Sequence, residues 1–175
     1  AFGFDLLKKT YDNKNQMVSP YSILSALAMV SNGAAGVTLD EFEDMFGMSI
    51  TDMNSYLYLL GETMPNDKCK FNSANAGWVN DDKDIELDKD YLQALSDYFD
   101  SNLYKESFNS DVVDNINAFI KRNTNDMIPK MIDDLDSDCA MVLVNALAFE
   151  GEWEEKYEES QVLDWKFNNL DGSNS

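Results

Sequence analysis

The feature that most constrains the fold is an apolar run from Met141 to Phe149, interrupted only by Asn145. Its length and its β-branched residues predict a strand, and apolar side chains at both odd and even positions require cover on both faces. The run therefore predicts that 141–149 is a central strand covered on both sides.

The rest of the chain is expected to be mostly helical. Ser19-Pro20 predicts a helix start, because the serine side chain accepts a hydrogen bond from a free N–H and proline at the first helical position loses none. The helix that follows, to about Asn32, is apolar nearly all round, which predicts an interior position. Further helices are expected over 2–12, 38–46 with a capping box at Thr38, 51–64 closed by Pro65, 88–99 capped by Asp88, and from Ser110 or Asp111 to about 122.

Three more strands are expected, over 71–80, 102–107 and 162–167, and residues 123–138 are expected to be mostly loop. The last strand runs into 168–172, Asn-Asn-Leu-Asp-Gly, which is typical of a hairpin turn. A hairpin turn needs a returning strand, so we expect this chain to be one part of a larger architecture. An open apolar edge on its central strand would then keep it from folding stably alone.

Charge restricts the function classes. Thirteen Lys and Arg residues stand against 33 Asp and Glu, which gives a net charge of −20, and there is no histidine. We expect no nucleic-acid or membrane partner, because phosphate backbones and anionic lipids repel such a chain and no run of about 18 apolar residues is present. Without histidine, no histidine-based catalytic triad or histidine-ligated metal can form.

Asn145 and the two cysteines are the isolated residues of interest. A buried amide without partners costs about 1–3 kcal/mol, so Asn145 is expected to be hydrogen-bonded. From spacing alone a structural amide is favoured over a polar latch between neighbouring elements. Cys69 and Cys139 lie far apart in sequence, which favours two unpaired thiols. A single disulfide between them is the alternative.

Two acidic segments resemble functional sites only superficially. Asp134-x-Asp136-x-Asp138 has the spacing of a calcium loop, but Cys139 stands where that loop needs glycine. The glutamates of 150–159 would allow a hydrolase with paired carboxylates, although a solvated charged surface is favoured. Neither segment supports a catalytic, cofactor or metal site.

The order of the motifs along the chain resembles the serpin family of serine protease inhibitors. The resemblance covers essentially all 175 residues, about the first half of a serpin domain. The motifs that carry it are Val18-Ser19-Pro20-Tyr21-Ser22-Ile23, Thr38-Leu39-Asp40-Glu41, Asn75-Ala76-Gly77-Trp78-Val79, Ile116-Asn117-Ala118-Phe119-Ile120 with Thr124-Asn125 and Ile128, and Leu143-Val144-Asn145-Ala146 followed by Phe149-Glu150-Gly151-Glu152-Trp153.

The resemblance implies an α+β fold with helices packed around a large β-sheet A and parts of sheets B and C. Residues 1–175 would be the N-terminal half of a single serpin domain, and the half with the reactive loop would be absent. The implied function is inhibition: a protease cleaves the loop, which inserts as a new strand into sheet A and traps the protease. The alternative is a non-inhibitory serpin acting as a chaperone, carrier or storage protein.

The resemblance also implies partners. The target would be a chymotrypsin-like or subtilisin-like serine protease, with a cysteine protease as an alternative, and the other partner would be the C-terminal half of the domain. We expect an inhibitor and not an enzyme, without cofactor, in an extracellular setting, with a cytoplasmic location as the alternative.

Four residues match positions at which serpins control the opening of sheet A. Ser19 and Ser22 match serines of the shutter, the region beneath the sheet, and Asn145 matches the shutter asparagine, which reverses the preference for a purely structural amide. Trp153 matches the tryptophan of the breach at the top of the sheet. Glutamates at 150 and 152 stand where lysines are common in the family, so an acidic breach surface is expected.

Overall fold

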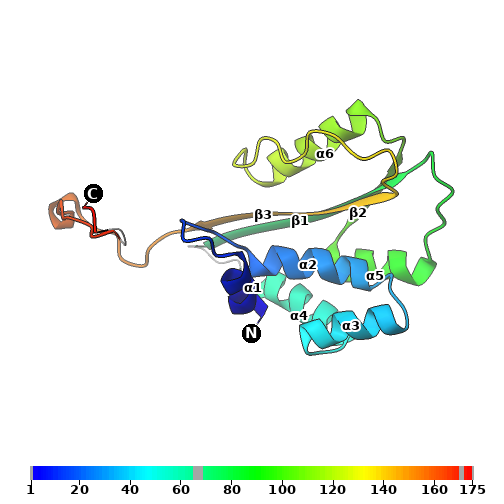
Figure 1. Ribbon diagram of the computed structural model, residues 1–175, viewed down its shortest axis with the longest axis horizontal. Coiled ribbons are helices and arrows are strands. Elements are labelled where there is room, and N and C mark those ends of the chain that lie inside the picture. Colours follow the sequence, from blue (N-terminus) through cyan, green and yellow to red (C-terminus); the bar gives the residue numbers. More distant parts are fainter. Residues whose placement is uncertain (1, 65–68, 170–171, 175) are drawn as a thin grey trace.

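A three-stranded sheet lies between two layers of helices in the computed structural model, which describes residues 2–64, 69–169 and 172–174 (Figure 1). The strands are β1 (Cys69–Asn80), β2 (Asn102–Glu106) and β3 (Met141–Gly151), in the order β2-β1-β3. β1 runs parallel to β2 and antiparallel to β3. The helices are α1 (Phe2–Thr10), α2 (Pro20–Ser31), α3 (Val37–Phe46), α4 (Ile50–Thr63), α5 (Lys89–Phe99) and α6 (Ser110–Asn123).

The predicted strand over 141–149 is confirmed, but its expected central position is not. Within the described residues, β1 occupies the centre and β3 has a neighbouring strand on one side only. The apolar pattern predicts that both faces of the strand are covered, and α2 and α6 do cover β3. It carries no information about neighbouring strands within the sheet. The strands predicted over 71–80 and 102–107 and the mostly irregular segment 123–138 are confirmed.

One face of the sheet packs against α6. Trp78 of β1 is 2% exposed and meets the Phe119 ring edge to face, with centroids 5.6 Å apart. On its other side the Tyr104 ring stacks on it at 5.2 Å. The core on this face consists of Ala76, Trp78, Val112, Ile116, Phe119, Ile120 and Ala146. Even-numbered positions of β1 and β3 therefore point towards α6, as the alternation of a strand requires.

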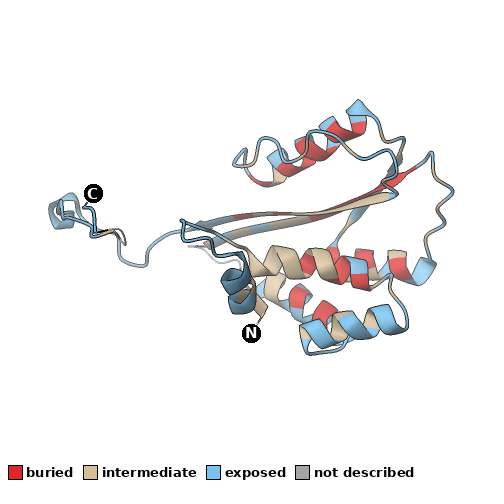
Figure 2. Cartoon of the chain, viewed as in Figure 1, coloured by how far each residue is buried: buried red, intermediate tan, exposed pale blue. Residues whose placement is uncertain are grey.

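The opposite face packs against α2, with α4 and α5 beneath it (Figure 1). The buried residues of this second core are Ala28, Met29, Met53, Leu57, Tyr91, Leu95 and Phe99, and Met141 and Leu143 of β3 pack against them. The interior position predicted for the 20–32 helix is confirmed by the complete burial of Ala28 and Met29. Buried residues lie on the helices of both layers (Figure 2) and in β1, where Asn75–Asn80 are all buried.

Two of the predicted helix caps are correct. The Ser19 side chain accepts a hydrogen bond from the Ser22 N–H, and Asp88 accepts from the first N–H groups of α5. The capping box at Thr38 is wrong, because α3 begins one residue earlier and its N-cap is Gly36, with φ at 56°. The cap of α6 is Asn109 and not Ser110 or Asp111, since its extended backbone lets its side chain reach two N–H groups. Pro65 lies outside the described residues.

The predicted strand over 162–167 is wrong. This segment has no regular structure and follows a single 3-10 turn, η1 (Glu159–Gln161), on an arm that extends away from the sheet (Figure 1). Its alternating apolar residues have no strand to pair with among the described residues, and Trp165 is 89% exposed. The predicted turn at 168–172 includes residues 170–171, which lie outside the described part; of the residues flanking them, Asn169 N–H donates to the Ser173 carbonyl at 2.9 Å.

Gly77 marks a close approach between β1 and its neighbours. A Cβ at this position would overlap Leu103 Cδ2 and lie 3.1 Å from Leu143 Cδ2. We expect Gly77→Ala to lower the free energy of unfolding by about 1 kcal/mol, because only the ends of the two leucine side chains must shift. Gly33→Ala is the control, since its Cβ would meet only ordinary contacts from 3.4 Å outwards. Equal denaturation midpoints for the two variants would contradict this packing.

Candidate functional site

The candidate site is the edge of β3 that has no neighbouring strand in the described part of the chain, together with the polar side chains around Asn145. Asn145 lies in the middle of β3, directly opposite Asn75 of β1. Its Nδ2 donates to Ser73 Oγ at 2.9 Å and to Asn75 Oδ1 at 2.8 Å. Asn75 Nδ2 donates in turn to the Phe99 carbonyl at 2.8 Å, at the end of α5. These side chains thus connect β3 to β1, and β1 to the helical layer beneath.

Only the nitrogen of the Asn145 side-chain amide is hydrogen-bonded within the described residues. Its Oδ1 is buried and has no hydrogen-bond partner among the described residues. The same holds for the hydroxyl groups of Ser25 in α2 and Ser101 after α5. A buried acceptor without a donor costs about 1–3 kcal/mol. The site therefore has an acceptor on β3 that a further hydrogen-bond donor would stabilise.

Ser19 and Ser22 lie at the start of α2, the helix that packs against β3. Their interaction with one another is a helix cap, in which Ser19 Oγ accepts from the Ser22 N–H at 3.2 Å. Within the described part of the chain, no hydrogen bond joins either serine to Asn145, whose donor bonds go to β1. The fold thus places the three residues on facing elements without a direct polar contact.

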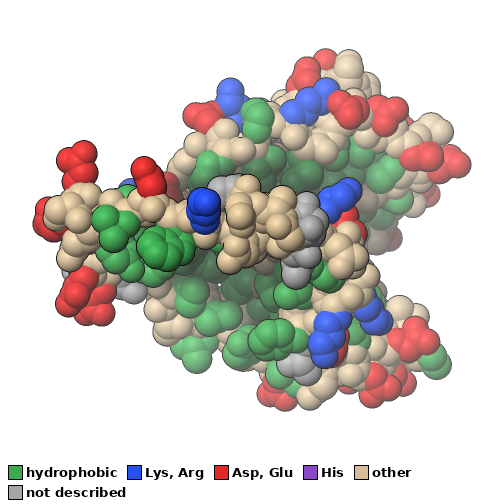
Figure 3. All heavy atoms as spheres, turned by 60° about the vertical axis from the view of Figure 1, so that its left-hand side comes forward, with side chains coloured by type: hydrophobic (Ala, Val, Ile, Leu, Met, Phe, Trp, Pro, Cys, Tyr) green, Lys and Arg blue, Asp and Glu red, His purple; other side chains and the backbone are tan. Residues whose placement is uncertain are grey.

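Trp153 lies two residues beyond the end of β3, and 76% of it is exposed. Trp153 belongs to the arm that leaves the sheet, whereas Asn145 and its hydrogen-bond partners lie within the sheet. Figure 3 shows hydrophobic side chains on this arm beside carboxylates. Phe149, Tyr157, Val162 and Leu163 are exposed like Trp153.

The glutamates near Trp153 have separate partners. Glu150 accepts from Lys70 Nζ at 3.2 Å and from Asn125 Nδ2 at 2.8 Å, and these two interactions hold its pKa below the usual value. Glu152 pairs with Lys156 at 3.0 Å on the surface. A carboxylate whose pKa is lowered does not suit the role of a general acid, because a general acid needs a raised pKa. The arrangement gives no support to a hydrolase at 150–159.

An apolar cavity of about 640 Å³ is lined in part by Met141 and Leu143 of β3. It lies between α2, β3 and the start of α5, and burial raises the pKa of the Tyr91 hydroxyl at its wall. Its lining residues are Ala26, Leu27, Val30, Gly33, Glu86, Leu87, Asp88, Tyr91, Met141 and Leu143. The apolar surface of the second core thus remains accessible beside β3.

Other chemistry is sparse in this structure. Cys69 and Cys139 are not bonded to one another in this structure, because Cys69 begins β1 opposite Gly151 and Cys139 lies just before β3, at the other end of the sheet. Over residues 2–64, 69–169 and 172–174, no group of three or more acidic or cysteine side chains is arranged to hold a metal ion. None of the helices in these ranges is both long and apolar enough to cross a bilayer.

Sequence reasoning identified Asn145 but missed its partners Ser73 and Asn75. Their signal is a pair of polar residues two positions apart in a strand, which places both side chains on one face. That pattern also fits an exposed strand face, and only the register of β1 against β3 distinguishes the two. Ser25 was missed as well, because serine is common within helices.

Comparisons with known proteins place the chain in one family. The family model described as Serpin (serine protease inhibitor) matches residues 1–175. Serpin-ZX of Arabidopsis thaliana is 30% identical over 92% of this chain and 44% of its own length. Iripin-2 of Ixodes ricinus is 33% identical, with 87% of this chain and 41% of the relative covered.

A solved structure agrees with these sequences. The thermophilic serpin tengpin, in its latent state, superposes with a TM-score of 0.89 at 38% identity, and the match covers 99% of this chain and 48% of tengpin. The chain therefore spans about half the length of the relatives it matches. Its helices, its mixed sheet and its sequence agree in showing that this chain belongs to the serpin family.

Proposed function

We propose that this chain is the N-terminal half of a serpin domain that inhibits a serine protease by accepting its own cleaved reactive loop as a new strand beside β3. The loop and the strands beyond β3 would come from the C-terminal half of the domain. A chymotrypsin-like or subtilisin-like protease is the proposed target. In this mechanism Ser19, Ser22 and Asn145 regulate the opening of the sheet, and Trp153 lies at the end where insertion begins.

The observation that supports the proposal is the outer edge of β3, which has no neighbouring strand among the described residues. A strand of eleven residues that is apolar on both faces and pairs on one side only is a template for another strand. The unpartnered Asn145 Oδ1 lies at the middle of this strand, where an incoming strand or its neighbour would supply a donor. The cavity beside Met141 and Leu143 gives apolar side chains of that strand a place to pack.

Several relatives are named for inhibition. Serine protease inhibitor 42Dd of Drosophila melanogaster is 32% identical over 91% of this chain, and a serine protease inhibitor of Mus musculus is 29% identical over 95%. Both are matched over less than half of their length. Their names support the proposed class of function, and the part of the protein that would contact the protease lies outside this chain.

The alternative is a non-inhibitory serpin. The fold also occurs in a thyroxine-binding globulin complexed with a thyroxine–fluorescein conjugate, at 24% identity and a TM-score of 0.85. That likeness shows the fold alone. Both readings predict the same arrangement of β1, β2 and β3, so they must be separated by a functional assay.

The assay incubates the full-length protein with chymotrypsin-like and subtilisin-like proteases and separates the products by denaturing electrophoresis. Inhibition by trapping predicts an adduct that survives denaturation, because an acyl bond joins the protease to the cleaved serpin. A protease carrying alanine in place of its catalytic serine is the control and forms no adduct. Cleavage of the full-length protein by every protease without any such adduct would favour the non-inhibitory alternative.

A further inference from the structure

The end of α2 carries an asparagine that is followed directly by glycine. Asn32-Gly33 is the only Asn-Gly pair in the sequence, and every other asparagine is followed by a residue that has a side chain. In such a pair the main-chain nitrogen of the glycine can attack the side-chain amide carbon of the asparagine, because glycine has no Cβ to obstruct the approach and its backbone rotates freely. Of all the asparagines in this chain, Asn32 is therefore the most disposed to lose its side-chain amide.

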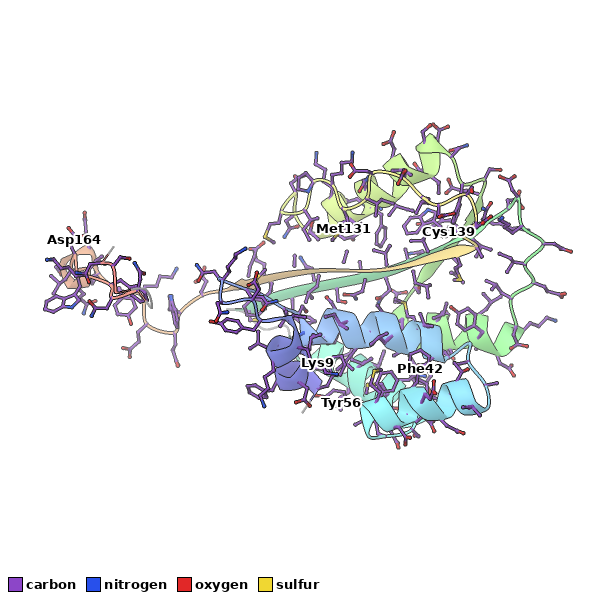
Figure 4. The ribbon with its side chains drawn as sticks, in the orientation of Figure 1. Lys9, Phe42, Tyr56, Met131, Cys139 and Asp164 are labelled. Atoms are coloured by element: carbon purple, nitrogen blue, oxygen red, sulfur yellow. The ribbon has the colours of Figure 1, made fainter. Side chains whose placement is uncertain are left out.

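The Asn32 side chain is held at both ends of its amide. Its Nδ2 donates to the Ala28 carbonyl at 2.7 Å and to Asn54 Oδ1 at 3.0 Å. Its Oδ1 accepts from Asn54 Nδ2 at 2.8 Å. Asn32 and Asn54 thus form a reciprocal amide pair, and this pair joins α2 to α4, which lies against α2 on the side away from the sheet (Figure 4).

Asn54 is a firm partner because it is buried on the inner side of α4. It is 3% exposed, and its neighbours Met53 and Leu57 belong to the buried core. Tyr56, labelled on α4 in Figure 4, is half exposed and marks the outer side of the helix. Within the described residues, Asn32 is the only hydrogen-bond partner of the Asn54 side chain. Separating the two would leave a buried amide unpaired, so the pair resists opening.

The backbone at Asn32 is also held in an unreactive conformation. Asn32 is the C-cap of α2, with φ at −64° and ψ at −20°, and the Gly33 N–H donates to the Val30 carbonyl at 3.0 Å. The attack requires the Gly33 nitrogen to lose its proton and to close a five-membered ring on Asn32 Cγ, which a helical backbone does not permit. The last turn of α2 must therefore open before the reaction starts, and the pair with Asn54 opposes that opening.

We propose that Asn32-Gly33 is a site of spontaneous deamidation that Asn54 keeps inactive in the folded protein. When the last turn of α2 opens, hydroxide removes the proton from the Gly33 nitrogen, this nitrogen bonds to Asn32 Cγ, and the side-chain amide leaves as ammonia. Water then hydrolyses the succinimide ring to aspartate or to isoaspartate. The inference goes beyond the proposed function, because it concerns the contact between α2 and α4 and stands whether or not the protein inhibits a protease.

A modified chain cannot restore the pair. Aspartate replaces the Nδ2 donor of Asn32 with an oxygen, which would face two acceptors, the Ala28 carbonyl and Asn54 Oδ1. Isoaspartate instead routes the main chain through the former side chain and lengthens it at the end of α2. Deamidation therefore removes the polar connection between α2 and α4 permanently, and modified molecules accumulate with time.

The test follows the peptide that contains Asn32 by mass spectrometry while the full-length protein is incubated in mildly alkaline buffer. We expect deamidation at Asn32 to be at least about tenfold slower in the native protein than in the same protein unfolded in denaturant. Asn54→Leu removes the pair but keeps the size of the side chain and a good helix former, and it is expected to raise the rate in the folded protein about tenfold. Asn54→Ala replaces it if the leucine variant does not fold.

Two further variants make the outcome decisive. Gly77→Ala disturbs the sheet without touching the pair and is expected to leave the rate at Asn32 within about twofold. Adding Gly33→Ala to Asn54→Leu is expected to return slow deamidation, because a Cβ at position 33 fits the fold but obstructs ring closure. The proposal is refuted if native and unfolded protein deamidate equally fast, if the folded Asn54 variant shows no acceleration, if Gly77→Ala accelerates equally, or if adding Gly33→Ala does not slow the reaction.

Discussion

Trp78→Ala is expected to lower the free energy of unfolding of the full-length protein by about 3–5 kcal/mol, as is usual for a large aromatic side chain removed from a core. Trp78 is 2% exposed, contacts Phe119 and Tyr104, and fills the layer between the sheet and α6. Removing it leaves a cavity that the buried neighbours on α6 and β3 cannot fill without moving. Denaturant unfolding followed by circular dichroism measures the change.

The control for Trp78 is Tyr56→Ala, which removes an aromatic side chain that is half exposed on α4. Because Tyr56 covers little buried surface, its loss should cost less than about 1 kcal/mol. Similar losses for the two variants would show that the core between the sheet and α6 is not organised around Trp78.

Asn145→Ala is expected to lower the free energy of unfolding by about 1–3 kcal/mol and to promote polymers. The substitution removes both donor bonds from β3 to β1 and leaves the buried Asn75 Oδ1 without a donor. With β3 less firmly held to β1, the sheet should open more often and accept a strand from another molecule. Unfolding in denaturant measures the first effect, and native electrophoresis after mild heating measures the second.

Asn72→Ala is the matched control, because it truncates an amide that is exposed on the neighbouring strand. Its stability and its tendency to polymerise should equal those of the native protein. If Asn145→Ala melts at the native temperature and stays monomeric, Asn145 is a passive amide and has no part in holding the sheet closed.

Local chemistry explains which parts of the fold could be predicted. Ser19 and Asp88 cap helices because of interactions within three residues, which a sequence displays directly. The strand at 141–149 is predictable because its composition reports burial on both faces. Near Thr38 and Ser110, more than one residue could be the N-cap of the helix. The backbone conformations of Gly36 and Asn109 make these two residues the N-caps.

Pairing between distant segments could not be predicted. The alternation over 162–167 is typical of a strand, but a strand also needs a partner, and the described chain provides none there. The bonds from Asn145 to Ser73 and from Asn125 to Glu150 join residues 72 and 25 positions apart, so they depend on sheet register and on the path of residues 124–138. For these contacts, family resemblance located Asn145 but not the residues that satisfy it.

The central claim is that β3 can receive a new neighbouring strand and that this stabilises the molecule. The most direct measurement compares the melting temperature of the full-length protein before and after it is cut once, near its C-terminal end, by a catalytic amount of protease. The account predicts a rise of about 10 °C or more, because an inserted strand adds backbone hydrogen bonds along β3 and covers its apolar edge. An unchanged or lower melting temperature after a single cut would contradict it.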